Sequence, residues 1–245
     1  MRAPSLYPDV FVSAWRAALK IRILGSAAGG GFPQWNCNAP LSRAVREGKP
    51  EFLPRTQSSI AVSADGSQWA VFNASPDLRQ QIAANPPLQP RADGPLRASP
   101  IEAVVLTNAD VDHIAGLINL REREPFSLYA TDRVLTTLAA NSIFNVLDPD
   151  LVPRRPLPFN RPVDLVGPDG PLGLAIEAFP VPGKIAMFLE NAANPNFGTA
   201  EGDTIGLRIA ASGAGQGRAL YYIPGCARVD GVLLDRVEGA GCLMF

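Results

Sequence analysis

Short strand-like and helix-like segments alternate along most of the chain, and this alternation is the feature that most limits its possible folds. The predicted strands are apolar and rich in β-branched residues, and they cover residues 20–25, 102–106, 126–130, 174–181, 184–190, 204–211 and 219–223, with a hairpin over 58–74. The predicted helices cover 75–85, 114–124 and 131–142. Two proline- and glycine-rich stretches, 86–100 and 148–173, are expected to form a linker and a surface excursion. The pattern predicts an α/β protein with two sheets and helices outside them.

Turn and capping residues support several of these boundaries. Asp65-Gly66 is a strong turn signal in the middle of the hairpin. Ser75 stands where the N-cap of one helix is expected, and Thr131 has the same role in a later helix.

The charge balance argues against a nucleic-acid-binding protein. The chain has 22 Lys and Arg against 23 Asp and Glu, a net charge of −1, whereas non-specific nucleic-acid binding needs a basic face. No apolar run approaches the length of a membrane span.

The three cysteines are too few and too scattered for a disulfide framework, so a reducing, cytoplasmic location is expected.

The first 19 residues differ from the rest of the chain. Arg16 interrupts their apolar part, and a secretory signal would need a more basic start and a longer apolar stretch. We therefore expect residues 1–19 to be a flexible N-terminal extension and residues 20–245 to form the folded domain.

The segment TNADVDHIAGL, residues 107–117, holds two aspartates and the single histidine of the chain. It follows a predicted buried strand and leads into a predicted helix, the position at which α/β folds place their sites. Asp110, Asp112 and His113 therefore predict a metal site, and such oxygen-rich donors suit iron, manganese or magnesium better than zinc. In the alternative interpretation, Asp112 caps the helix and Asp110 orients the histidine.

The single histidine excludes several kinds of site. It cannot supply the three imidazoles of a hydrolytic zinc site or the two of a facial-triad iron site. A Ser–His–Asp triad is also disfavoured, because no serine lies in a nucleophile-elbow sequence.

Other loops carry weaker signals. The glycine-rich loop 25–38 lacks the spacing of a dinucleotide or phosphate-binding loop, but its glycines allow a close approach of the backbone to a ligand. Cys226, in a Pro-Gly-Cys turn, could be a ligand, a reactive thiol or an inert buried residue. Lys184 and Asp203 also lie in turns beside predicted strands, where they bind a ligand or are simply solvated.

Several long motifs resemble one family. They are KIRILGSAAGGGFPQWNCN, RTQSSIAVSADG, FNASPDLRQQI, TNADVDHIAGLINLRE, YATDRVL, FPVPGK, GDTIGLRI and YYIPGCA, which together run from residue 20 towards the C-terminus. They are similar to the pyrroloquinoline quinone (PQQ) biosynthesis protein B family. The resemblance implies a metallo-β-lactamase-like αββα sandwich.

The resemblance also implies roles for the candidate residues. The metal-binding loop of the superfamily's hydrolases reads His-x-His-x-Asp-His, and the matching positions here are Asn108, Asp110, Asp112 and His113. By the same register, Lys184 stands near a third histidine ligand. The expected metal ligands are Asp110, Asp112 and His113, and the expected catalytic residues are Asp112 and His113. The expected substrate-binding residues are Asn108, Lys184, Asp203 and Cys226.

Two activities follow from the resemblance, and neither is that of a β-lactamase. One is an iron- and oxygen-dependent hydroxylation of the tyrosine in the Glu–Tyr precursor, with zinc or manganese less expected as the metal. The other is non-catalytic carriage of PQQ or its precursor towards the periplasm. The implied partners are PQQ, its peptide-derived precursor and other PQQ biosynthesis proteins.

Three departures from the family pattern carry further expectations. The family's N-terminal loop holds a structural zinc through a Cys-x-Cys-x-x-Cys cluster, and because this chain has Cys37, Ala39 and Ser42 there, that zinc is expected to be lost. The family continues beyond the strand that ends at Phe245, so the sandwich is expected to be incomplete at its C-terminus. Family members start next to Lys20, so residues 1–19 could be a start-site artefact.

Overall fold

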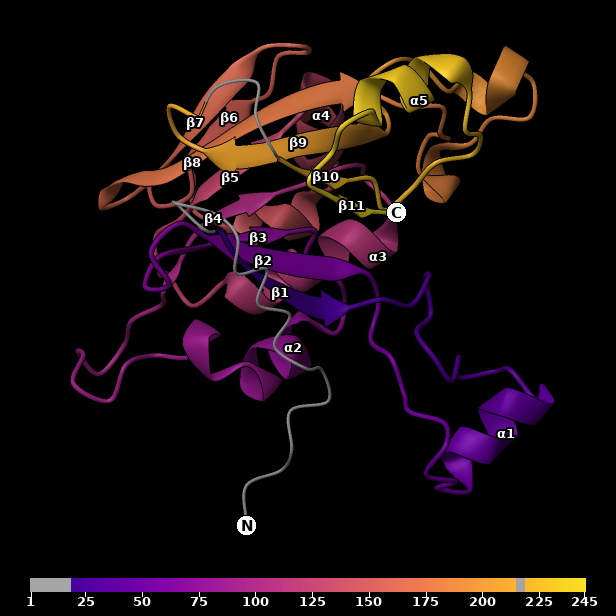
Figure 1. Ribbon diagram of the computed structural model, residues 1–245, viewed down its shortest axis with the longest axis horizontal. Helices are drawn as coiled ribbons and strands as arrows, with labels where there is room; N and C mark the ends of the chain where they lie inside the picture. The colour runs from indigo at the N-terminus through magenta and orange to yellow at the C-terminus, as the bar shows by residue number, and fades with distance from the viewer. Residues whose placement is uncertain (1–18, 215–218) are drawn as a thin grey trace.

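The computed structural model describes residues 19–214 and 219–245, and these form two β-sheets stacked face to face (Figure 1). The first sheet has the strand order β1-β2-β3-β4-β5-β6, in which β1 to β3 pair antiparallel and β3 to β6 pair parallel. Its strands are β1 Lys20–Gly25, β2 Ser59–Ser63, β3 Trp69–Phe72, β4 Ile101–Val105, β5 Ser127–Ala130 and β6 Arg154–Pro156.

The second sheet has the order β11-β10-β9-β8-β7. Its strands are β7 Pro162–Gly167, β8 Gly170–Pro180, β9 Ile205–Ala211, β10 Leu220–Tyr222 and β11 Cys242–Met244. β7 to β10 pair antiparallel, and β11 pairs parallel to β10.

The helices are short, and those that pack on the sandwich cover the outer faces of its two sheets. The α-helices are α1 Pro40–Arg46, α2 Leu78–Ala84, α3 Val111–Ile114, α4 Asp132–Ala140 and α5 Gly231–Val237. The 3₁₀ helices are η1 Pro86–Leu88, η2 Ala115–Leu120, η3 Ser142–Val146, η4 Met187–Leu189 and η5 Pro195–Gly198. In Figure 1, α2 lies under the first sheet and α5 over the second, whereas α1 stands apart from the sandwich on two long connections.

Within the described residues, three apolar clusters hold these layers together. The cluster between the sheets joins residues such as Ile60, Phe72 and Val105 of the first sheet to Ile176 and Leu207 of the second. Because side chains alternate along a strand, the neighbouring residues face outward and pack under the helices. A larger cluster fills the space between the first sheet and α2, η2 and α4, and a small one lies under α5. The result is the αββα sandwich that the sequence predicts.

Several local predictions are confirmed. The hairpin forms between β2 and β3, with its turn at Asp65-Gly66. Thr131 caps α4, because its hydroxyl accepts a hydrogen bond from the Val134 N–H at 3.3 Å. Ser75, in contrast, does not cap α2. Its hydroxyl bonds the Gln81 side chain, and the helix begins only at Leu78.

Two predicted segments are wrong in their secondary structure. Residues 184–190 form a loop with the 3₁₀ helix η4 instead of a strand, because the Leu189 N–H bonds back to the Ala186 carbonyl and Met187 is 77% exposed. The stretch 148–173, predicted as a surface excursion, contains β6, β7 and the start of β8. The prolines in β6 and β7 are tolerated because each of these strands lies at the edge of its sheet.

The predicted helix 114–124 is also wrong in its position. The helix begins earlier, at Val111, and changes after Ile114 into a 3₁₀ helix that ends at Leu120. The cause is the end of β3: Ala74 N–H donates to the His113 carbonyl at 2.7 Å, and Gly116 N–H donates to the Ala74 carbonyl at 2.8 Å. These bonds replace the i→i−4 bonds of a regular helix.

Helices α1 and α5 and strand β11 were not among the elements predicted from the sequence. The predicted N-terminal extension lies outside the described residues except for Leu19, which packs against the core between the sheets. In the part of the chain that the structure describes, no helix is both long enough and apolar enough to span a membrane.

Candidate functional site

The loop that follows β4 carries the predicted site and is anchored by a buried polar network. The Asn73 side-chain oxygen accepts the Thr107 backbone N–H at 2.9 Å, and its amide nitrogen donates to the Thr107 hydroxyl at 2.9 Å. The Thr107 hydroxyl lies 3.3 Å from His113 Nδ1. All three side chains are buried, so these polar groups depend on one another for partners. The network fixes the position of the imidazole ring.

Tyr222 joins this network from the second sheet. Its hydroxyl lies 3.2 Å from Ser58 Oγ and also hydrogen-bonds Asn73. Burial raises the pKa of Tyr222 to about 12, and the hydrogen bonds to Ser58 and Asn73 only partly offset that effect. The phenol is therefore neutral at physiological pH.

Asp112 and His113 face a common cavity. The Asp112 Oδ2 atom lies 3.8 Å from His113 Nε2, and both residues line a cavity of about 470 Å³. The cavity is bounded by the glycine-rich loop, the end of β10 and the last residues of the chain: Ile23, Gly25, Ser26, Ala27, Ala28, Gly29, Ser58, Ile60, Tyr222, Pro224, Met244 and Phe245. Burial lowers the pKa of His113, and the charge of Asp112 opposes that shift. His113 is therefore a neutral imidazole at physiological pH.

The glycine-rich loop approaches Asp112 closely. A Cβ atom at Gly29 would lie 3.3 Å from Asp112 Oδ2, which is tighter than an ordinary contact. The Gln57 side chain holds the loop by accepting the Gly30 N–H at 2.9 Å. The close approach that the glycines were expected to allow is thus made to a predicted site residue.

Asp110 does not line this cavity. Its carboxylate accepts the Asn108 side-chain N–H at 3.2 Å and the Met187 backbone N–H at 3.4 Å. Burial raises its pKa, and the nearby charge of Asp112 adds to this effect. The capping interpretation is wrong in both parts: Asp110 rather than Asp112 occupies the N-cap position of α3, and Thr107 rather than Asp110 contacts His113 Nδ1.

The donor set fits a metal ion only in part. Among the described residues, no three His, Cys, Asp or Glu side chains are arranged to hold one ion. Asp112 and His113 provide two converging donors, with an oxygen and a nitrogen close enough to share an ion between them. The other ligands would come from water, a substrate or a movement of Asp110, whose role as a ligand stays a prediction.

None of the four predicted substrate-binding residues lines the cavity, and Asn108 lies beside the Pro-Gly-Cys turn. It is buried, forms a bridge to Thr204, and its amide nitrogen would be 3.7 Å from a Cβ atom at Gly225. The Pro-Gly-Cys turn is therefore brought next to the metal-loop residues, although only Pro224 of that turn lines the cavity.

Lys184, Asp203 and Cys226 lie outside the cavity. The Lys184 side chain is 66% exposed, and its ammonium group lies 5.6 Å from the centre of the Phe197 ring. The Asp203 carboxylate accepts two hydrogen bonds from Arg133, at 2.7 and 3.0 Å. Cys226 donates its thiol proton to the Arg228 carbonyl. Each side chain already has a protein partner, and their roles in substrate binding stay predictions.

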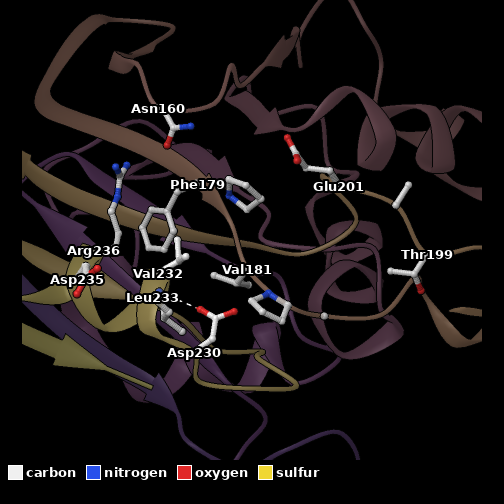
Figure 2. Close-up of a pocket in the computed structure, with 14 residues that line it drawn as sticks. Asn160, Phe179, Val181, Thr199, Glu201, Asp230, Val232, Leu233, Asp235 and Arg236 are labelled. Atoms are coloured by element: carbon white, nitrogen blue, oxygen red, sulfur yellow. Dashed lines mark hydrogen bonds between the residues drawn. The ribbon is translucent and has the colours of Figure 1, made fainter.

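A second, larger cavity of about 770 Å³ lies between the end of β8, the loop before β9 and α5 (Figure 2). Figure 2 shows the Phe179 ring, Val232 and Leu233 in its wall, with Arg236 beside Phe179. Arg236 Nη2 donates a hydrogen bond to Glu177 Oε1 at 2.5 Å. None of the predicted site residues lines this cavity. We place the candidate site in the smaller cavity, because a buried imidazole and a carboxylate converge there.

The predicted loss of a structural zinc concerns the start of α1. Cys37, Ala39 and Ser42 lie together there, and the Ser42 hydroxyl hydrogen-bonds the Cys37 thiol and lowers its pKa. One thiolate provides a single ligand, whereas structural zinc sites use four. The loss of this zinc stays a prediction.

Sequence reasoning missed Asn73, Ser58 and Tyr222. The signal that could have indicated Asn73 is its place at the end of a buried strand, where it adopts a φ of 62° that asparagine tolerates better than most residues. No local signal indicates Ser58 or Tyr222, because their contact joins residues 164 positions apart.

Comparisons with known proteins agree with this fold. The profile of the Beta-lactamase superfamily domain matches residues 68–245. The coenzyme PQQ synthesis protein B of Rhodopseudomonas palustris is 53% identical over 228 residues, which are 93% of this chain and 72% of that protein. The protein of the same name from Gluconacetobacter diazotrophicus is 50% identical over 224 residues, 91% of this chain and 71% of its own length.

Solved structures give the same result. The crystal structure of Zn²⁺-bound PqqB from Methylobacterium extorquens has a TM-score of 0.82 and 48% identity, and the match covers 91% of this chain and 71% of that one. A diphosphatase of the PhnP family shares the fold at a TM-score of 0.62 and 19% identity, covering 91% of this chain and 71% of its own. The metallo-β-lactamase-like fold that the sequence motifs imply is confirmed.

Proposed function

Because the chain belongs to the coenzyme PQQ synthesis protein B family, we propose that it acts in PQQ biosynthesis and that its reaction takes place in the cavity lined by Asp112 and His113. The proposed reaction is a metal-dependent hydroxylation of the tyrosine in the Glu–Tyr precursor. The observation that carries this proposal is the convergence of Asp112 Oδ2 and His113 Nε2, 3.8 Å apart, on that cavity.

The lining of the cavity favours a metal-dependent site over a metal-free one. PQQ and its peptide-derived precursor carry carboxylates, yet none of the described residues that line the cavity is Lys or Arg, and one of them is Asp112. A carboxylate ligand would be repelled by Asp112 unless a cation lay between them. A metal ion held by Asp112 and His113 would supply that cation.

The size of the cavity suits a small substrate. Its volume of about 470 Å³ lies within the range of small-molecule sites. Residues 25–29 of the glycine-rich loop line one part of the cavity, and Ser58 and Tyr222, whose hydroxyl groups lie 3.2 Å apart, line another. These groups would orient the polar ends of the precursor.

The proposed hydroxylation requires a metal ion that reacts with O₂ and a base that removes a proton from the tyrosine ring. One oxygen atom of O₂ enters the tyrosine ring in place of hydrogen, and the other leaves as water; a two-electron donor and two protons complete the balance. A bound iron ion would supply redox and Lewis-acid chemistry. With Asp112 and His113 both holding the ion, the Asp112 carboxylate oxygen that the ion does not engage would accept the proton released from the ring carbon.

The test is the hydroxylated product. The purified protein, loaded with Fe²⁺, is incubated with a peptide that contains the Glu–Tyr pair, O₂ and ascorbate, and the peptide mass is measured. The wild type should add one oxygen atom to the peptide, the Asp112→Asn variant should not, and the Asp93→Asn variant, which alters an exposed carboxylate, should behave as the wild type. Equal product from Asp112→Asn, or none from the wild type, would contradict a hydroxylase at this site.

A carrier of PQQ is the second candidate, and the small donor set favours it. Only two side chains of the described chain converge on a possible ion, whereas redox iron sites commonly use more protein ligands. In that case PQQ itself would bind in the cavity without chemical change and be carried towards the periplasm. Quenching of tryptophan fluorescence by PQQ, together with an absence of hydroxylated peptide, would support the carrier. Quenching that is unchanged in Asp112→Asn would place PQQ outside this cavity.

A further inference from the structure

The chain between β1 and β2 forms an arm, residues 32–55, that includes α1 and stands away from the sandwich (Figure 1). Two paired segments carry this arm. Phe32 and Arg55 donate backbone hydrogen bonds to each other, both at 2.8 Å, and Ala27 forms a parallel bridge with Gln57. These backbone pairs make a stalk that holds the arm out into solvent.

The arm has a defined shape of its own. The Arg46 guanidinium donates hydrogen bonds to the carbonyl oxygens of Cys37 and Gln34. Ser42 and Ala44, both on α1, are buried. A surface that is already ordered loses less conformational entropy when it binds a partner, so the arm is suited to docking.

The arm presents apolar side chains and positive charge to solvent. Trp35 is 85% exposed, and three further large apolar residues of the arm are exposed: Leu41, Phe52 and Leu53. Exposed apolar side chains that are concentrated on one projecting element mark a surface that binds a partner. The arm has a net charge of +2, from Arg43, Arg46, Lys49 and Arg55 against Glu47 and Glu51.

The larger cavity beside α5 has the opposite charge (Figure 2). It is lined by the carboxylates of Glu201, Asp230 and Asp235. The cation in its described lining, Arg236, is already paired with Glu177. Among the residues that the structure describes, Glu201 and Asp235 have no hydrogen-bond or ion-pair partner. The cavity therefore keeps uncompensated negative charge.

The walls of this cavity are largely apolar. Phe179, Val181 and Leu233 line it, and Val232, at the start of α5, is 80% exposed and lies at its rim. Its volume of about 770 Å³ is within the range of ligand-binding sites. Apolar walls with negative charge fit a partner that carries apolar side chains and basic groups together, and the arm of this chain has both.

We propose that two copies of the chain form a symmetric dimer in which the arm of each copy docks in the α5 cavity of the other, with Trp35 as the anchor. The charge complementarity of the arm and the cavity favours a second copy as the partner. In Figure 1, α1 and α5 lie on the same side of the sandwich, one below the first sheet and the other over the second. A two-fold axis between them makes the same contact twice and closes the dimer. The proposal is independent of the reaction in the smaller cavity.

Sedimentation equilibrium of the purified chain tests the dimer. We expect the wild type to have twice the mass of one chain. Trp35→Ser should raise the dissociation constant at least tenfold, because buried tryptophans commonly dominate the binding energy of an interface. The control Leu96→Ser removes a fully exposed apolar side chain from the linker before β4 and should dimerise as the wild type does. A monomeric wild type would overturn the proposal and leave the arm for a different protein. An unchanged dissociation constant in Trp35→Ser would overturn it as well.

A substitution at the cavity identifies the surface that the arm contacts. Val232→Lys adds a cation at the rim, where it repels the basic arm, and should also raise the dissociation constant at least tenfold. The double variant Trp35→Ser/Val232→Lys should dissociate no more readily than the weaker single variant, because both substitutions disrupt the same contact. Dimerisation unaffected by Val232→Lys, or additive effects in the double variant, would overturn docking in this cavity. Both residues are exposed in one copy, so the variants should fold, and their melting temperatures check this.

Discussion

The Asp112 carboxylate and the His113 imidazole meet at the wall of one cavity, with 3.8 Å between Oδ2 and Nε2. Neighbours in sequence on a short helix do not usually point to the same place, since successive residues of an α-helix lie about 100° apart. They do so here because the helix is only four residues long and its backbone is held by Ala74 at the end of β3. The first sheet therefore determines the geometry of the site.

The stability of the metal-free protein should depend on the titration of His113. Burial lowers its folded-state pKa, so the unfolded chain binds this proton more readily. The stabilisation is present above the unperturbed pKa of 6.5 and is lost as the pH falls from there towards the folded-state pKa. Denaturant unfolding between about pH 5 and 7 should show a smaller loss of stability on acidification for His113→Gln than for the wild type. Parallel pH profiles for the two proteins would contradict this assignment.

Asp110 should have the opposite pH dependence. Burial and the charge of Asp112 raise its folded-state pKa, so the folded protein holds this proton more tightly than the unfolded chain does. Its contribution favours folding below the unfolded-state pKa and is lost as the pH rises through the folded-state value. Asp110→Asn should therefore raise the melting temperature at neutral pH and have less effect in acid. A lower melting temperature at neutral pH would mean that the Asp110 charge is stabilised by a partner.

Two glycine substitutions should separate folding from function. A Cβ atom at Gly116 would lie 2.0 Å from the Ser75 carbonyl oxygen, so Gly116→Ala should destabilise the protein by about 3 kcal/mol or more. At Gly29 the added methyl group would meet only the Asp112 side chain, at 3.3 Å. Gly29→Ala should keep its melting temperature within a few degrees of the wild type but weaken binding in the cavity. Thermal unfolding and a ligand titration on both variants check this contrast.

Asp203 should contribute to stability through Arg133. The Asp203 carboxylate is 8% exposed and is held by two hydrogen bonds from the guanidinium, which is itself partly in solvent. Removing the cation in Arg133→Met leaves a buried carboxylate unpaired and should cost about 2 kcal/mol. The free energies of unfolding of Arg133→Met and of the double variant Arg133→Met/Asp203→Asn, compared with each other, measure the cost of the unpaired carboxylate. A double variant no more stable than Arg133→Met would show that the unpaired carboxylate is not the cause.

Local signals predicted much of the sandwich. The hairpin turn at Asp65-Gly66 and the Thr131 cap depend on residues close in sequence, and both are confirmed. The strand predicted at 184–190 is wrong because alternation of apolar residues cannot show whether a neighbouring strand is available for pairing. The prolines of β6 and β7 concealed two strands, because edge position is a property of the whole sheet.

The residues of the candidate site could be predicted only where they are adjacent in sequence. Asp112 and His113 stand side by side in sequence and were both predicted. Asn73 lies 34 positions from Thr107, and the contact exists only because β3 and β4 are paired. Long-range pairing of this kind leaves no local pattern, so the residues that orient His113 could be found only in the structure.

Asp112 and His113 are proposed to hold one metal ion together, and a calorimetric titration tests this most directly. Fe²⁺ is titrated under anaerobic conditions into the wild type, Asp112→Asn, His113→Gln and the control Asp93→Asn. We expect the wild type and the control to bind one equivalent of Fe²⁺. The affinity for Fe²⁺ should be at least a hundredfold lower in each single site variant. The double variant Asp112→Asn/His113→Gln should bind Fe²⁺ no more weakly than the single site variants do. Affinity unchanged in either single site variant would contradict a shared ion, and with it the metal-dependent function proposed for this cavity.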